Sequence, residues 1–153
     1  MNLDPVRSIA ALSSRWRNRF SRSKDSSPEH LRRGRRGEKL ACKYLRRRGY
    51  KILYRNFKDR TGGEIDIVCR DGDTLVFVEV KTRGDEEFGR PIEAVDRQKQ
   101  FRISKGGLAW LRLLDNPDVI FRFDVVEVLM PRDADPRFEL IQNAFELSQP
   151  YLY

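Results

Sequence analysis

Glu64-Ile65-Asp66-Ile67-Val68-Cys69 and Val76-Phe77-Val78-Glu79-Val80-Lys81 are the two stretches that decide the fold of this chain. Both are dense in Ile and Val, a composition typical of buried β-strands. Asp71-Gly72-Asp73 lies between them and predicts a tight hairpin turn. The two stretches are therefore expected to be neighbouring strands, each carrying charged residues within an otherwise apolar run.

Alternation of side chains along a strand predicts where those charges lie. Glu79 and Lys81 share a face with Phe77, opposite the three valines at 76, 78 and 80. On the preceding strand, Glu64 and Asp66 share a face opposite Ile65 and Ile67. If the two acidic faces coincide, the carboxylates gather beside Lys81.

A cluster of carboxylate oxygens is the ligand set that hard divalent cations such as Mg²⁺ or Mn²⁺ prefer. A metal so placed can activate water and neutralise charge during phosphodiester hydrolysis, and a lysine beside it suits the same chemistry. The alternative is a solvated ion pair between Glu79 and Lys81 on the outer face of a hairpin. The apolar flanking positions favour burial, where an acid without a partner is costly.

Composition excludes several classes of protein. The chain has 153 residues, enough for one domain, with 39% hydrophobic and 35% charged residues. No apolar run approaches the roughly 20 residues that cross a bilayer. Cys42 and Cys69 form no C-x-x-C pair and suit a reduced, cytoplasmic protein. His30 is the sole histidine and lies in a polar stretch, which argues against His-based hydrolases.

The net charge of +8 is concentrated in one block. Residues 31–60 carry 13 Lys/Arg against two Asp/Glu, whereas residues 61–153 carry 12 against 18. A basic block beside an acidic site predicts a polyanionic partner, most readily a nucleic acid. A solvated helix face is the alternative. The candidate nucleic-acid-binding residues are Arg32, Arg33, Arg35, Arg36, Lys39 and Lys43.

The expected domain runs over residues 31–148, preceded by a basic, flexible extension over 1–30 and followed by a tail over 149–153. An organelle-targeting role for residues 1–20 is disfavoured by Asp4 and by the lack of a cleavage-type signal. Periodicity predicts a helix over 31–48, strands over 50–57, 64–69 and 76–81, a helical stretch from Pro91 to Leu114, and strands over 119–129 and 138–142. Gly106-Gly107 is a candidate break in that second helix. The fold class is α/β, a mixed sheet flanked by helices in the order α-β-β-β-α-β.

This ordered string of motifs resembles the PD-(D/E)XK nuclease superfamily, with its restriction-endonuclease-like fold. Within it, the chain is similar to the bacterial YraN-like family, which is related to Holliday-junction resolvases. The resemblance covers about residues 34–145. It is carried by Gly34-Arg35-Arg36-Gly37-Glu38, Gly49-Tyr50-Lys51-Ile52-Leu53, Arg55-Asn56-Phe57, Gly63-Glu64-Ile65-Asp66, the strand 76–81, Phe88–Val95, Arg122–Val126 and Asn143-Ala144-Phe145.

The resemblance implies roles for individual residues. Asp66 and Glu79 would hold Mg²⁺ or Mn²⁺, and Lys81 would orient the attacking water or neutralise the scissile phosphate. Glu38, on the first helix, matches the extra acid that resolvase-like members use near the metal. Gln98 matches a helix glutamine after the motif, with Gln100 as its competitor.

The sequence thus favours a metal-dependent endonuclease that acts on DNA, with branched or damaged DNA as the form suggested by the resemblance. The alternative is a non-catalytic nucleic-acid-binding module with a nuclease fold, and a third hypothesis is an interaction protein with solvated charges. A homodimer is expected by analogy, because a two-fold junction needs two sites. No membrane partner is expected.

Overall fold

A computed structural model of the chain describes residues 27–84 and 95–148. The elements are α2 (Glu29–Arg47), β1 (Lys51–Lys58), β2 (Glu64–Asp71), β3 (Thr74–Arg83), α3 (Arg97–Leu113), β4 (Phe121–Leu129) and β5 (Arg137–Phe145). The expected extension over 1–26, the segment 85–94 and the tail over 149–153 lie outside the described residues. The α/β class is confirmed, and the expected order α-β-β-β-α-β is confirmed up to β4; β5 follows as a second strand after α3, over the stretch expected at 138–142.

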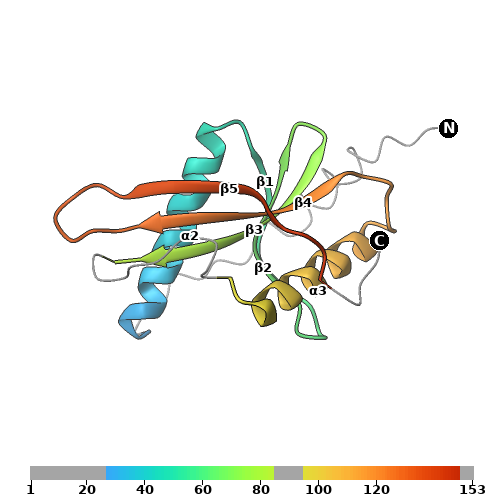
Figure 1. Cartoon of the computed structure of the whole chain (residues 1–153), viewed down its shortest axis with the longest axis horizontal. Coiled ribbons are helices and arrows are strands. Elements are labelled where there is room, and N and C mark those ends of the chain that lie inside the picture. Colours follow the sequence, from blue (N-terminus) through green and yellow to red (C-terminus); the bar gives the residue numbers. More distant parts are fainter. Residues whose placement is uncertain (1–26, 85–94, 149–153) are drawn as a thin grey trace.

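The five strands form one mixed sheet in the order β1-β2-β3-β4-β5 (Figure 1). Neighbours are antiparallel except β3 and β4, which are parallel and are linked through α3. A parallel pair needs such a crossover connection. The turn predicted at Asp71-Gly72-Asp73 is confirmed, with Gly72 at a φ of 56° in the left-handed region that glycine tolerates.

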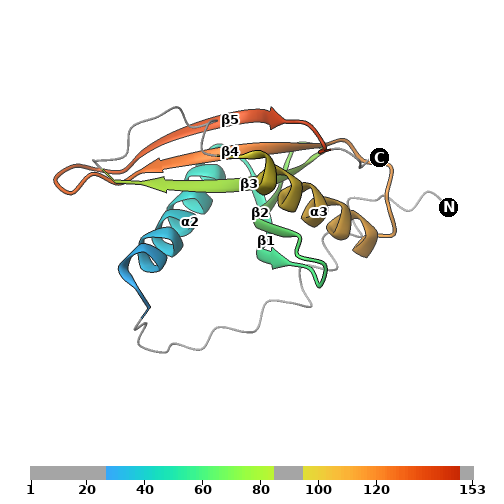
Figure 2. The same ribbon diagram turned by 60° about the horizontal axis from the view of Figure 1, so that its bottom comes forward.

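The helices cover opposite faces of the sheet and make two cores. On one face, α2 packs Ala41, Cys42 and Leu45 against Val76, Val78 and Val80. On the other, α3 packs Ile103, Leu108 and Leu111 against Phe77, Phe123 and Val125. The alternation predicted for β3 is therefore confirmed. In Figure 2 the ends of β1 and β2 descend between the two helices.

The predicted alternation is wrong at Ile65. Ile67 lies in the core under α2 as expected for its face, but Ile65 joins Phe77 in the core under α3. The reason is that β2 pairs with β3 only from Ile67 to Asp71, whereas its pairing with β1 continues to Glu64. The strand leaves β3 at this point and turns, so a strict two-residue period does not carry through.

Two glycines let the helices approach the sheet closely. A Cβ on Gly37 would lie only 2.9 Å from the Cβ of Thr82, so α2 crosses β3 at a distance that a side chain would prevent. A Cβ on Gly106 would lie 2.9 Å from Ile65 Cγ1 and 3.0 Å from the backbone nitrogen of Glu64. The helix is continuous through Gly106-Gly107, so the candidate break there is wrong: these glycines serve packing.

The bounds of α3 also correct the prediction for this stretch. Residues 91–94 lie outside the described residues, and Val95 and Asp96 are not helical. Asp96 is instead the N-cap, and its carboxylate accepts a hydrogen bond from the backbone nitrogen of Lys99 at 2.8 Å. Such a cap satisfies an otherwise unpaired amide and fixes where the helix begins.

Candidate active site at the fork between β2 and β3

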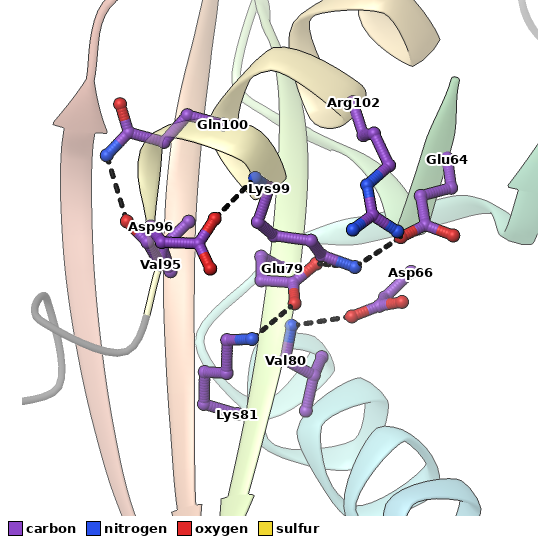
Figure 3. A network of polar contacts seen from close by, with 10 residues as sticks. All are labelled: Glu64, Asp66, Glu79, Val80, Lys81, Val95, Asp96, Lys99, Gln100 and Arg102. Atoms are coloured by element: carbon purple, nitrogen blue, oxygen red, sulfur yellow. Dashed lines mark hydrogen bonds and ion pairs between the residues drawn. The ribbon is translucent and has the colours of Figure 1, made fainter. Parts of the chain in front are cut away.

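The candidate site lies where β2 separates from β3. On the N-terminal side of Ile67, β2 no longer pairs with β3, which leaves the backbone nitrogen of Val80 without a strand partner on that side. The Asp66 carboxylate accepts its hydrogen bond at 2.8 Å, as Figure 3 shows. Asp66 is thereby fixed in the fork, beside the carboxylate of Glu79.

Glu79 is almost fully buried, with 3% of its surface exposed. Its Oε1 lies 3.1 Å from Lys81 Nζ, and its Oε2 lies 3.3 Å from Lys99 Nζ on α3. Oε2 nevertheless has no hydrogen bond of good geometry. Burial, and next the nearby charge of Asp66, raise the pKa of Glu79 to about 7. A buried acid next to a second acid resists ionisation in this way.

Glu38 approaches the fork from α2. Burial, and next the charge of Asp66, raise the pKa of Glu38 above its usual value, while a hydrogen bond from Asn56 and the charges of Arg55 and Arg35 oppose that rise. Asn56, which lies in β1, has a backbone φ of 54°. Asparagine tolerates the left-handed region better than other non-glycine residues. Asp66 thus stands within electrostatic reach of Glu79 and of Glu38.

Glu64 is placed differently from the other acids. Its Oε1 lies 2.7 Å from Lys99 Nζ and 3.5 Å from Arg102 Nη1. The hydrogen bond from Lys99 is the main cause that lowers the pKa of Glu64. Its role as an additional acid of the site stays a prediction, and in this structure it serves as the partner of two cations on α3 (Figure 3).

Gln98 is not brought to the fork. It is exposed and lines a shallow groove of about 680 Å³ with Gln100, Phe101 and Leu147. Gln100 donates a hydrogen bond to the carbonyl oxygen of Val95 at 3.0 Å. The α3 residue that reaches Glu79 is Lys99, which the sequence analysis does not single out. Lys99 stands between Gln98 and Gln100, and no motif in the sequence indicates that its side chain would contact the acids.

The basic block divides into three groups along α2. Arg32, Arg33 and Arg36 line a groove of about 870 Å³, and Arg132 in the β4–β5 connection lines its other wall. Arg35 lies instead near Glu38 and acts on its charge. Lys39 and Lys43 are exposed further along the helix. Sequence reasoning missed Arg132, because the β4–β5 connection lies about 100 residues away along the chain.

Burial of Glu79 predicts a dependence of stability on pH. Between about pH 4.5 and 7 the folded protein keeps a proton on Glu79 that the unfolded chain has lost, so stability falls as pH rises through that window. We expect Glu79→Gln to remove this fall. The free energy of unfolding of the variant, relative to wild type, should rise by about 3 kcal/mol from pH 4.5 to 8.

Urea unfolding in EDTA measures this difference. Glu146→Gln is the control, because Glu146 is exposed on the segment after β5. Parallel pH profiles for wild type and Glu79→Gln would contradict the assignment.

Comparisons with known proteins place the chain in a family. A profile of the uncharacterised protein family UPF0102 matches residues 37–128. A UPF0102 protein of Geobacter sulfurreducens is 54% identical over 115 residues, which cover 75% of this chain and 89% of that protein. A relative in Geobacter metallireducens is 52% identical over 115 residues, covering 75% and 93% respectively.

A third UPF0102 protein, from Syntrophus aciditrophicus, is 48% identical over 120 residues, covering 78% of this chain and 93% of that protein. The region that matches the profile contains Glu38, Asp66, Glu79, Lys81 and Lys99, whereas Arg32 to Arg36 precede it. In the part of the chain that the structure describes, no helix has the length and apolarity needed to cross a membrane. The chain belongs to the UPF0102 family, the YraN-like family, a member of the PD-(D/E)XK nuclease-like superfamily.

Proposed function

We propose that this protein is a metal-dependent nuclease that hydrolyses phosphodiester bonds in DNA. The observation that carries the proposal is the convergence of Asp66 and Glu79 at the fork, with Lys81 directly on Glu79. A buried acid with a perturbed pKa beside a second acid and a lysine is common at catalytic sites and unusual on a solvated surface.

The residues at the fork fit a hard divalent cation. Carboxylate oxygens are the donors that Mg²⁺ and Mn²⁺ prefer, and Glu79 Oε2 is a buried acceptor without a hydrogen bond. Asp66 and Glu79 would hold the ion, with Glu38 as a third acid on the α2 side. A bound divalent cation would supply charge neutralisation at the phosphate and a lower pKa for water.

Among the described residues, however, no three acidic side chains stand ready as a metal site. In this arrangement lysines neutralise Glu79, and Glu38 is held by Asn56. Metal binding therefore requires small movements of side chains, and the backbone of β2 and β3 already sets the positions of Asp66 and Glu79.

Each residue of the fork has a task that follows from its contacts. Asp66 is anchored by the Val80 amide, so its carboxylate presents its other oxygen, Oδ1, in a fixed direction. Lys81 is 26% exposed, so its ammonium can face a phosphate from outside while it keeps the Glu79 contact. There it would screen the charge that grows on the phosphate during attack, or orient the water.

A non-catalytic nucleic-acid-binding module is the second candidate. The observation that favours it is the neutralisation of Glu79 by two lysines, which satisfies its charge without a metal. The basic groove on α2 would serve either function. A homodimer, and a preference for branched or damaged DNA, remain predictions that rest on the family resemblance.

The arginines at the N-terminal end of α2 predict how DNA affinity responds to salt. We expect replacement of Arg32, Arg33, Arg35 and Arg36 by alanine to weaken binding to all sequences alike, because phosphate contacts carry no base information. On duplex DNA the log–log slope of affinity against salt should become shallower by about 0.9 for each phosphate that the variant no longer neutralises. Fluorescence anisotropy across a salt series measures both effects.

The matched control is the triple replacement of Arg46, Arg47 and Arg48 at the other end of α2. These arginines are exposed in or beside the last turn, where the helix dipole already favours cations. Their loss should change the salt slope less. A slope unchanged by the four substitutions at 32–36 would show that the block is a solvated surface.

A panel of labelled substrates tests the function itself. Junction, flap, duplex and single-stranded DNA are incubated with the purified chain in Mg²⁺, in Mn²⁺ and in EDTA. We expect cleavage of at least one form with metal and none in EDTA. Salt-dependent binding without cleavage of any form would support the non-catalytic module.

A further inference from the structure

Lys99 is the residue of α3 that reaches into the site. The Asp96 cap fixes the start of the helix through the Lys99 backbone nitrogen, and the lysine side chain extends from the first turn toward the fork (Figure 3). Its Nζ lies 2.7 Å from Glu64 Oε1 and 3.3 Å from Glu79 Oε2. One ammonium is therefore shared between an outer acid and a buried one.

The two contacts of Lys99 differ in quality. The contact with Glu64 is a short, charge-assisted hydrogen bond, which is the stronger kind. The contact with Glu79 Oε2 is longer and is an ion pair without hydrogen-bond geometry. Lys99 therefore supplies positive charge at Oε2 and leaves the lone pairs of that oxygen unused.

We propose that Lys99 is a stand-in cation. In the metal-free protein its ammonium neutralises Glu79 Oε2, and a divalent cation takes over that role when it binds. Glu64 keeps the displaced ammonium beside the fork. This inference rests on the proposed function, because it assumes a metal at Asp66 and Glu79. Glu64 is then a positioning residue for Lys99, and the two glutamates compete for one lysine.

Competition of this kind gives effects of opposite sign. Lys99→Met removes the rival of the metal, so Mn²⁺ affinity should rise by about tenfold, the usual effect of one charge within a few ångströms. Glu64→Gln removes the stronger partner of Lys99. The Lys99 ammonium then interacts with Glu79 alone and competes more strongly with the metal, so Mn²⁺ affinity should fall several-fold. Isothermal titration of the full chain with MnCl₂, without DNA, measures both.

The double variant separates this exchange from a simple sum of charges. If Glu64 acts through Lys99, Glu64→Gln should change Mn²⁺ affinity little once Lys99 is methionine, and the two substitutions will not be additive. Arg102→Met is the matched control. Arg102 also contacts Glu64 but shows no contact with Glu79 among the described residues, so its loss should leave Mn²⁺ affinity nearly unchanged.

Stability without metal provides a second measure. In EDTA at pH 8, Lys99→Met should lower the melting temperature, because the buried Glu79 carboxylate loses one of its two ammonium neighbours. Saturating Mn²⁺ should restore much of that loss. Lys99→Gln, which keeps a polar end, serves as a second variant if the methionine substitution disturbs folding.

The outcomes distinguish this inference from the function on which it rests. Additive effects, or unchanged Mn²⁺ affinity in Lys99→Met while Asp66→Asn abolishes binding, would overturn the stand-in role alone. Mn²⁺ binding that persists unchanged in Asp66→Asn would overturn both the metal site and the stand-in role. A higher affinity in Lys99→Met with a non-additive double variant supports the proposal.

Discussion

Asp66→Asn is expected to lower the rate of metal-dependent DNA cleavage by roughly 10³-fold or more, because a bound cation is worth several kcal/mol of transition-state stabilisation. The substitution keeps the size of the side chain and one oxygen that can still accept from Val80. The fold should survive, so the loss will report on the charge of the carboxylate. Single-turnover cleavage with excess protein measures it.

The control for this substitution is Asp73→Asn. Asp73 lies in the turn between the same two strands and is exposed, so its charge is close in sequence and remote from the fork. We expect cleavage by this variant at the wild-type rate. Equal rates of cleavage by Asp66→Asn and wild type would show that the Asp66 carboxylate takes no part in the reaction.

Lys81→Ala should lower cleavage by about 10²–10³-fold while DNA affinity stays within about twofold of wild type. A group that acts mainly on charge developing in the transition state affects turnover more than ground-state binding. Lys81 also neutralises Glu79 at 3.1 Å, so the variant should lose some metal-free stability above pH 7. Cleavage rates and anisotropy binding on the same substrate separate the two effects.

Lys51→Ala is the comparison for Lys81→Ala, since Lys51 is an exposed lysine at the start of β1, opposite Arg70 and away from the fork. It should affect neither rate nor affinity strongly. If Lys81→Ala turns over at the wild-type rate, the Glu79–Lys81 contact is a structural ion pair, as the alternative interpretation of the sequence held.

The sequence was most informative about β3. Strand alternation places Glu79 and Lys81 with Phe77 and away from the valines, and the structure confirms it because β3 stays paired with β4 from Leu75 to Arg83, even beyond Val78 where β2 leaves it. The same rule was wrong at Ile65, where β2 keeps only one partner. The two places differ in the path of the strand: β3 continues along β4 without a change of register, whereas β2 turns away from the sheet together with β1.

The α3 side of the site was harder to predict for a related reason. Successive residues on a helix point about 100° apart, so an error of one residue in matching a motif selects a different direction. The resemblance selects Gln98, whose role stays a prediction, whereas the next residue, Lys99, is the one that contacts Glu79. The direction in which each α3 side chain points depends on the Asp96 cap and on the close packing of Gly106 against β2. The packing of Gly106 is a tertiary contact.

Gly106-Gly107 is a second place where a tertiary contact limits prediction from the sequence. Propensity correctly gives Gly106-Gly107 a cost within a helix. The structure shows what offsets it: Gly106 lies against the backbone of Glu64, and this close approach brings Lys99 within reach of Glu64 and Glu79. Such a contact cannot be inferred from composition, because its partner lies more than 40 residues away in the chain.

The central claim is that a divalent cation binds between Asp66 and Glu79. The most direct measurement is an electron paramagnetic resonance titration that counts Mn²⁺ bound to wild type, Asp66→Asn and Glu79→Gln at pH 8. Glu79 should then be mostly ionised, given its pKa of about 7. We predict about one bound ion per chain in wild type and a large loss of binding in each variant. Equal binding by all three proteins would contradict the claim.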